Sequence, residues 1–276
     1  MMNMLKLRDL SVGYGHRAVI SDINMDLSQG GVYGLLGSNG CGKTTLMKTI
    51  AGGIEPVLGN IYAFNCIPFQ KHKEFLESMV YMPEDFRLPC CSVKKFIQLY
   101  GNIRPQFSVQ DFYDNLDSLN FHSNERIDRL SLGNKKKFFI AYSLACHPKI
   151  LLMDEPTNGL DMEAKKSFSK LMVTTDFSNS IVIVSTHLLP DLRNLLSGVI
   201  IVCDGKIALD SSIDKIASLL QFNNGENESL LYSDGLNTVS ANINGEYADV
   251  DIELLYYAIR ESNNVREYLK KNINHD

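Results

Sequence analysis

The chain has 276 residues, of which 45% are hydrophobic and 21% are charged, and its formal net charge is −5. These proportions are ordinary for a folded globular protein, and they exclude the fibrous and intrinsically disordered classes. The charge is uneven, because residues 221–276 carry ten acidic and four basic side chains, and the first 220 residues are therefore near +1. This balance gives no support to nucleic-acid binding.

The first predicted elements are two strands, at residues 4–14 and 18–27, in which apolar and polar residues alternate. This alternation is typical of an antiparallel sheet that exposes one face to water. The continuous apolar runs "GVYGLLG", "KILLMDE", "SIVIVST" and "GVIIVCDG" predict strands that are buried on both faces. Since helical patterns separate these runs, the chain up to about residue 210 is predicted to be an α/β domain around a central sheet.

Helical patterns replace the strand pattern between about residues 84 and 146. Ser92 and Ser108 are expected N-caps in this segment, because a serine hydroxyl accepts a hydrogen bond from a backbone N–H of the first helical turn. We interpret residues 84–146 as an inserted α-helical subdomain.

The C-terminal part follows a different pattern from the preceding domain. It contains a predicted helix at "SIDKIASLL", a linker rich in Asn and Gly, and a predicted helix across residues 252–271. The predicted organisation is therefore a domain at residues 1–210 and a small C-terminal appendage at residues 211–276.

The sequence "GSNGCGKTT" follows an apolar strand and precedes a helix, which is the context of a G-x-x-x-x-G-K-[ST] phosphate loop. In such a loop the glycines let backbone N–H groups surround a β-phosphate, and the N-terminus of the helix adds positive potential. Lys43 is expected to reach the β- and γ-phosphates, and Thr44 is expected to provide a hydroxyl to Mg²⁺. The expected nucleotide-binding residues of the loop are Gly37, Ser38, Asn39, Gly40, Cys41, Gly42, Lys43, Thr44 and Thr45.

Two acidic residues, Asp154 and Glu155, end the apolar strand "ILLMDE". Ligands bind at this end of the strands in open α/β sheets. Asp154 is expected to hold Mg²⁺ directly or through water, and Glu155 is then placed to orient or deprotonate an attacking water. An acidic pair at a strand end is also compatible with a helix cap or a solvated loop, and the phosphate loop favours the nucleotide role.

A second sequence of the phosphate-binding type, "LSLGN" at residues 130–134, stands at the predicted start of a helix. Three lysines, Lys135 to Lys137, follow in the first turn, where the helix dipole disfavours cations. Two interpretations of these lysines stay open, a solvated surface and a role facing phosphate or lipid.

No apolar run approaches the ~20 residues of a membrane helix, and the N-terminus lacks the apolar core of a signal peptide. We therefore expect a chain that neither spans a membrane nor is secreted. The six cysteines show no metal-ligand spacing, and Cys90 and Cys91 are adjacent, so we expect reduced thiols, as in a cytosol.

The phosphate loop, "LSLGN", "LLMDEPTNGLD" and "VSTHLL" occur in an order that resembles the ATP-binding subunit of an ABC transporter, over roughly residues 4–210. The resemblance implies an ABC-type P-loop NTPase core with an antiparallel β subdomain and an inserted helical subdomain. It also implies ATP hydrolysis with Mg²⁺. In that family two subunits pair head to tail, and the signature motif of each, usually LSGGQ, caps the ATP of the other.

The resemblance assigns roles to further residues. Tyr14 corresponds to the aromatic residue that stacks on adenine, although a tyrosine near a strand end is also compatible with a core or rim position. His187 matches the switch histidine that contacts the γ-phosphate. The residues that would reach the nucleotide of the partner subunit are Ser131, Gly133, Asn134 and Asp161.

The sequence departs from the family pattern at two motifs. In "LSLGN", Leu132 and Asn134 replace a glycine and a glutamine, while Ser131 and Gly133, whose hydroxyl and backbone N–H reach phosphate, are present. In "YMPEDF", Glu84 stands where glutamine is usual, a form that also resembles a subset of bacterial ABC-2-type exporter ATPases. We expect Glu84 beside Mg²⁺ among the catalytic groups, and because a carboxylate accepts but does not donate hydrogen bonds, water positioning is expected to change.

The resemblance implies a homodimer or a heterodimer with a second ATP-binding subunit, bound to separately encoded integral membrane subunits at the inner, cytoplasmic face of the cell membrane. The alternative is a soluble ABC ATPase acting on ribosomes or DNA. Such proteins resemble two cassettes in one chain or carry a long coiled coil, whereas here there is one cassette and 87 residues separate Lys43 from Ser131. A phosphate-loop kinase would leave "LSLGN" and His187 unexplained.

Overall fold

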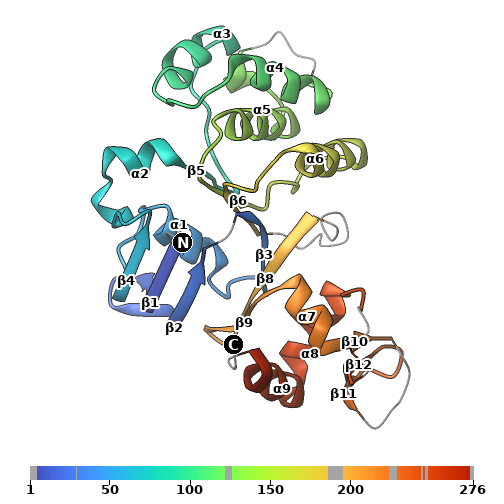
Figure 1. The fold of residues 1–276 in the computed structure, drawn as a ribbon. Helices are drawn as coiled ribbons and strands as arrows, with labels where there is room; N and C mark the ends of the chain where they lie inside the picture. The colour runs from blue at the N-terminus through green and yellow to red at the C-terminus, as the bar shows by residue number, and fades with distance from the viewer. Residues whose placement is uncertain are drawn as a thin grey trace.

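The computed structural model describes residues 5–28, 30–121, 126–185, 195–223, 229–243, 245 and 248–273. A six-stranded sheet lies at the centre, with a small antiparallel sheet beside it, a helical part at one end and the C-terminal part at the other (Figure 1). None of the helices in the described ranges combines the length and the apolar character that crossing a bilayer requires.

The central sheet has the strand order β5-β6-β7-β3-β8-β9. Its strands are β3 (Gly31–Gly37), β5 (Met79–Met82), β6 (Ile150–Asp154), β7 (Ile181–Ser185), β8 (Leu196–Cys203) and β9 (Lys206–Ser212). The strands from β5 to β8 are parallel, and β9 pairs antiparallel with β8. β6 and β7 are buried along their whole length, as their continuous apolar sequences predict.

The second sheet is antiparallel and has the order β2-β1-β4. Its strands are β1 (Leu5–Tyr14), β2 (Arg17–Leu27) and β4 (Leu58–Ala63). The apolar faces of β1 and β2 pack, together with helix α1 (Lys43–Ile50), against one face of the central sheet. Members of this core from the four parts are Leu7, Ile23, Leu46 and Leu152. The helix that begins at the phosphate loop is therefore fixed between the two sheets.

Helices cover the other face of the central sheet. They include α5 (Leu132–Ala145) and α6 (Met162–Thr174). Beyond them lie α3 (Val93–Phe96), its π-helical continuation η2 (Ile97–Gly101) and α4 (Val109–Ser118), where Phe96 and Phe112 pack against Phe138 of α5 (Figure 1). Shorter elements are η1 (Pro68–Gln70), α2 (Lys73–Ser78) and η3 (Ile127–Arg129). The predicted caps of α3 and α4 are present, because the hydroxyls of Ser92 and Ser108 accept hydrogen bonds from the backbone N–H groups of Lys95 and Asp111.

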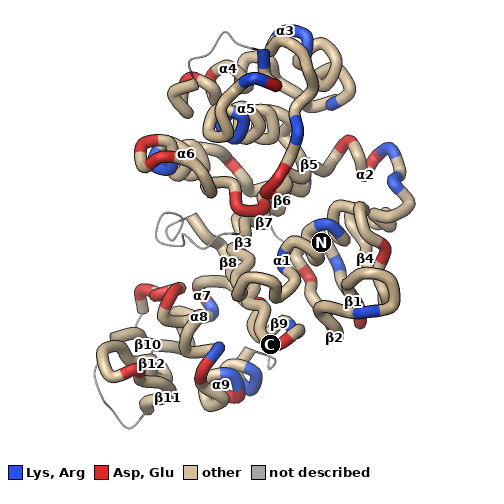
Figure 2. Tube along the Cα trace, turned by 180° about the vertical axis from the view of Figure 1, so that it is seen from behind, with Lys and Arg blue, Asp and Glu red and all other residues tan. Residues whose placement is uncertain are grey.

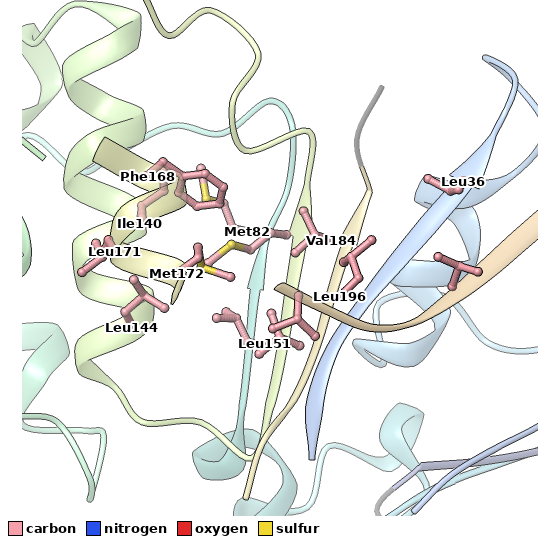
Figure 3. Packing of buried hydrophobic residues seen from close by; sticks show 14 of the residues in the cluster. Leu36, Met82, Ile140, Leu144, Leu151, Phe168, Leu171, Met172, Val184 and Leu196 are labelled. Atoms are coloured by element: carbon pink, nitrogen blue, oxygen red, sulfur yellow. The ribbon is translucent and has the colours of Figure 1, made fainter. Parts of the chain in front are cut away.

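The contact between α5, α6 and the sheet forms the larger core of the molecule. Figure 3 shows Ile140 of α5 and Phe168 and Met172 of α6 packed beside Met82 and Leu151 of the sheet. Because α5 begins with the signature motif and β6 ends with the acidic pair, this packing fixes the two motifs relative to each other.

The C-terminal part contains α7 (Ile213–Leu219), β10 (Leu220–Phe222), β11 (Leu230–Ser233), β12 (Thr238–Ala241), α8 (Ile252–Glu261) and α9 (Asn263–Ile273). The prediction of one helix across residues 252–271 is wrong, because the chain breaks at Ser262, whose hydroxyl donates to the carbonyl of Leu231 and accepts from the N–H of Val265. The sheet β10-β12-β11 was not predicted. Since Val239 and Leu255 share the larger core with Val199, the boundary near residue 210 stays a prediction.

Candidate active site

The loop between β3 and α1 forms one wall of the candidate active site. Lys43 is 7% exposed, and its ammonium group donates hydrogen bonds to the carbonyl oxygens of Gly37 and Ser38 at 2.7 and 3.2 Å. Gly42 has a φ of 109°, and a Cβ there would lie 2.7 Å from the side chain of Ile20. Glycine at this position therefore permits both the left-handed turn and the close approach of the loop to β2.

Asp154 ends β6 and is 1% exposed. Thr44 Oγ1 donates a hydrogen bond of 2.6 Å to its Oδ2, and Ser185 Oγ, from the neighbouring strand, donates to its Oδ1. A hydroxyl and a carboxylate side by side fit Mg²⁺, which takes oxygen ligands and usually keeps waters and substrate phosphates as its other ligands. The pair therefore suits a metal that binds together with a nucleotide.

Glu155 turns the chain away from the sheet in a left-handed conformation, with a φ of 47°. This conformation costs a residue other than glycine about 1–3 kcal/mol, and surrounding contacts must hold it. Its N–H donates to both the carbonyl and the hydroxyl oxygen of Ser185 at 3.1 Å. Its carbonyl accepts from Lys136 Nζ at 2.7 Å and from the N–H of Asn158 at 3.2 Å. Hydrogen bonds thus hold the backbone of Glu155, the expected catalytic residue, on both sides of its Cα.

These groups meet at a cleft of about 610 Å³. The expected residues that line it are Tyr14, Lys43, Thr44, Glu84, Asp154 and Glu155, with Asn39, Gly40, Gly42 and Thr45 of the loop. Gly37, Ser38 and Cys41 belong to the same loop but do not line the cleft. Tyr14 is 57% exposed at this cleft, which places it at a rim rather than in a core and leaves its ring accessible for stacking.

Acidic groups dominate the electrostatics of the cleft. Figure 2 shows Asp and Glu, in red, where the chain leaves β5 and β6. Glu84 Oε1 accepts a hydrogen bond of 3.0 Å from Asn158 Nδ2. Burial, and then the charge of Asp154, raise the pKa of the Tyr81 hydroxyl above its ordinary value. Burial lowers the pKa of Lys136, while nearby carboxylates, Glu84 first, act in the opposite direction.

The signature residues do not line this cleft. Ser131 caps α5, where its hydroxyl accepts from the N–H of Asn134 at 3.3 Å, and Ser131 itself is exposed. Gly133 lies in the first turn of α5, and Asp161 is the exposed N-cap of α6. Ser131, Gly133, Asn134 and Asp161 are therefore not among the residues that line the cleft of the same chain. His187 lies outside the described residues.

Sequence reasoning missed several residues of the site. Thr157, Asn158 and Lys165 line the cleft, Ser185 bonds both acidic residues, and Lys136 bonds the Glu155 turn. Neither open interpretation of the three-lysine run describes Lys136, which is 2% exposed and points into its own subunit. The helical spacing of residues 136, 140 and 144, all buried on α5, is the signal that could have identified it.

Comparisons with known proteins agree with this geometry. A family model described as "ABC transporter" matches residues 20–158. The chain is 30% identical over 222 residues to "Bacitracin transport ATP-binding protein BcrA" of Bacillus licheniformis, covering 78% of this chain and 72% of that protein. It is 29% identical over 229 residues to "Lantibiotic transport ATP-binding protein SrtF" of Streptococcus pyogenes, covering 80% and 96%.

A solved structure titled "Structure of ATP binding subunit of ABC transporter" has the same fold, with a TM-score of 0.68 at 24% identity, over 77% of this chain and 91% of that one. The fold and the cleft thus define a phosphate-loop ATPase. With the family model across about half of its length, the chain belongs to the ABC transporter family, as an ATP-binding subunit. The predicted family and fold class are confirmed.

Proposed function

We propose that the chain powers transport through separate integral membrane subunits, as one half of a head-to-tail dimer that closes around two ATP molecules. The observation that carries this proposal is the exposure of the second phosphate-binding motif, which does not line the cleft of its own subunit. Lys43 lines the cleft of its own subunit, whereas Ser131 and Leu132 stand exposed at the start of α5, outside that cleft. A phosphate-binding helix start that faces solvent fits the nucleotide of a second copy, or of a second ATP-binding subunit.

Each residue then has a role in a shared site. Lys43 binds the β- and γ-phosphates, and Thr44 and Asp154 would hold Mg²⁺. The bound metal would neutralise phosphate charge during transfer of the γ-phosphoryl group to water. Glu155 orients and deprotonates that water, and Glu84 lies at the same cleft.

Contacts outside the metal site complete the proposal. Tyr14 stacks on adenine, and His187 contacts the γ-phosphate from the same subunit. From the partner subunit, the hydroxyl of Ser131 and the N–H of Gly133 reach the γ-phosphate, with Asn134 and Asp161 beside them. Preorganised donors of this kind stabilise the charge that develops in the transition state.

The membrane subunit is proposed to bind at a second cleft, of about 680 Å³, near α2. Its lining combines the apolar side chains Leu76 and Ile103 with four cations and one carboxylate, namely Lys48, Lys71, Lys73, Arg104 and Glu77. An acidic segment with an apolar anchor complements this lining, because complementary charge guides docking and apolar contact holds it.

The relatives support a transport function, since two of them are named for bacitracin and lantibiotic transport. The proposed location is the inner, cytoplasmic face of the cell membrane, where the chain would be held by its membrane subunits. The alternative, a soluble ABC ATPase acting on ribosomes or DNA, has no specific observation in its favour.

The decisive experiment mixes two inactive variants, Ser131→Arg and Lys43→Ala. The arginine would block the γ-phosphate of the partner, and the alanine would remove the cation of its own site, so neither homodimer should hydrolyse ATP. The heterodimer contains one site with both defects and one site with neither. We expect hydrolysis to return when tagged heterodimer is isolated and assayed.

Calorimetry on each monomer provides the control. Ser131→Arg should bind ATP normally, whereas Lys43→Ala should bind it weakly. Thermal unfolding of Ser131→Ala measures the loss of the cap, which costs about 1 kcal/mol of stability. Normal hydrolysis by Ser131→Arg would contradict the shared site. An isolated heterodimer as inactive as the two homodimers would contradict two sites that work independently.

A further inference from the structure

Lys136 is a buried cation next to the active site to which no role has been given. It lies on α5 with 2% of its surface exposed, and its ammonium group donates a hydrogen bond of 2.7 Å to the carbonyl oxygen of Glu155. An ammonium group removed from water is costly unless charges of opposite sign and hydrogen bonds compensate it. The surroundings of Lys136 therefore have to contain that compensation.

A short series of hydrogen bonds connects Lys136 to Glu84. The carbonyl of Glu155 that accepts from Lys136 also accepts from the N–H of Asn158. The side-chain amide of Asn158 in turn donates to Glu84 Oε1 at 3.0 Å. The buried ammonium, the Glu155 turn and the Glu84 carboxylate thus belong to one connected group drawn from α5 and from the ends of β6 and β5.

The charges around this group are unbalanced without Lys136. Three carboxylates, Glu84, Asp154 and Glu155, line a cleft that has to receive the polyanionic phosphates of ATP. Two cations line the same cleft, Lys43, which bonds the phosphate loop, and Lys165, so the carboxylates outnumber the cations before any phosphate enters. Among the carboxylates that favour the charged form of Lys136, Glu84 acts most strongly.

We propose that Lys136 is the internal counter-charge of Glu84, a positioning residue that lets a cleft with three carboxylates bind Mg-ATP. The ammonium group acts from behind the Glu155 turn and touches neither nucleotide nor metal. Without it, Glu84 would repel the phosphates across a partly buried site, where screening by water is weak. The inference rests on the ATP site of the proposed function but not on the dimer.

A purely structural role is the competing explanation. Lys136 would then only hold the strained turn at Glu155, and any neutral replacement would harm the site regardless of the charge at Glu84. The two explanations differ in one respect. A counter-charge becomes unnecessary when Glu84 is neutral, whereas a turn-holding hydrogen bond does not.

The experiment is a double-mutant cycle with Lys136→Met and Glu84→Gln in the full chain. Glutamine keeps the size of Glu84 and an oxygen acceptor for Asn158 while removing the charge. Calorimetry measures the dissociation constant of a nonhydrolysable ATP analogue with Mg²⁺, which requires neither hydrolysis nor pairing. We expect Lys136→Met to raise that constant about tenfold, the scale of one uncompensated charge in a partly buried site.

The second substitution should restore binding. We expect the double variant to bind the analogue within about threefold of Glu84→Gln alone, which is a coupling between neighbouring charges. Lys137→Met is the matched control, since Lys137 is partly exposed and bonds the carbonyl of Asn120 on the outer side of α5. Its dissociation constant should match that of the unmodified chain.

Several outcomes would overturn the proposal. If Lys136→Met lowers the affinity equally with and without the Glu84→Gln substitution, the role of Lys136 is structural. If it lowers the affinity in neither background, Lys136 has no role in nucleotide binding. If Lys136→Met does not fold, thermal unfolding of the double variant decides, because a neutral pair should restore the folded state and a turn-holding role should not. Failure of the unmodified chain to bind the analogue would instead refute the ATP site itself.

Discussion

The nucleotide cleft and the cleft near α2 have similar volumes, about 610 and 680 Å³, but their linings differ in the sign of their net charge. The nucleotide cleft is acidic, and its carboxylates are held by hydrogen bonds, as when Asp154 accepts from Thr44 and Ser185. The second cleft is basic, and two of its cations, Lys71 and Lys73, are exposed, whereas the guanidinium of Arg104 donates hydrogen bonds to the carbonyls of Leu76 and Met79.

The difference separates two kinds of task. Transfer of a phosphoryl group depends on charges fixed within fractions of an ångström, and fixed polar groups need buried partners. Docking of another protein depends on sign and shape, and exposed lysines supply both without a fixed geometry. Substitutions in the first cleft should therefore change chemistry, and substitutions in the second should change assembly.

The largest effect is expected for Glu155→Gln, which removes the general base and keeps the backbone contacts of the turn. Hydrolysis should fall about 10²-fold or more, while ATP binding persists. The variant should accumulate as an ATP-bound dimer in size-exclusion chromatography with Mg-ATP. Turnover equal to that of the unmodified chain, together with a monomer only, would assign the base to another residue.

A charge reversal in the second cleft, Lys71→Glu with Lys73→Glu, should leave ATP binding within about twofold. Binding to membranes that contain the co-expressed membrane subunit should weaken about tenfold, since complementary rim charges act together and are screened by salt. Sedimentation at low and high ionic strength measures this. Lys270→Glu, an exposed charge reversal on α9, is the control, and an equal loss from it would exclude a specific docking cleft.

The smallest effect is expected at the rim of the nucleotide cleft. Tyr14→Ala should weaken ATP binding about three- to tenfold, because an aromatic stack contributes roughly 0.5–1.5 kcal/mol. Tyr14→Phe keeps the ring and should bind normally. Titration with a fluorescent ATP analogue compares the three chains, and equal affinity for Tyr14→Ala would place adenine elsewhere.

The nucleotide-binding half of the fold was predictable because its signals are local. Continuous apolar runs identified β3 and β6. Lys43, after β3, and Asp154, the last residue of β6, come together because parallel strands end at one edge of the sheet. The packing of α1 between two sheets then fixes the phosphate loop.

The remainder depends on contacts between distant segments. A lysine in a run of three is expected at the surface, and only the packing of α5 on the Glu155 turn shows that Lys136 is buried. The strands β10 to β12 have three or four residues each and lack a periodic signal. The break at Ser262 depends on a hydrogen bond to Leu231, about thirty residues earlier in the chain.

The short spacing between Ser131, the N-cap of α5, and Lys136 also has a mechanical consequence. Ser131 and Lys136 are five residues apart, about 7.5 Å along a helix axis, which is less than two turns. A helical segment this short has no free backbone torsion, so a displacement at Ser131 reaches Lys136 undiminished. In the proposed dimer, the nucleotide of one subunit lies against Ser131 of the other. A shift of that nucleotide would displace α5 of the second subunit, and Lys136 would carry the displacement to the Glu155 turn of that subunit. The two ATP sites would then move together.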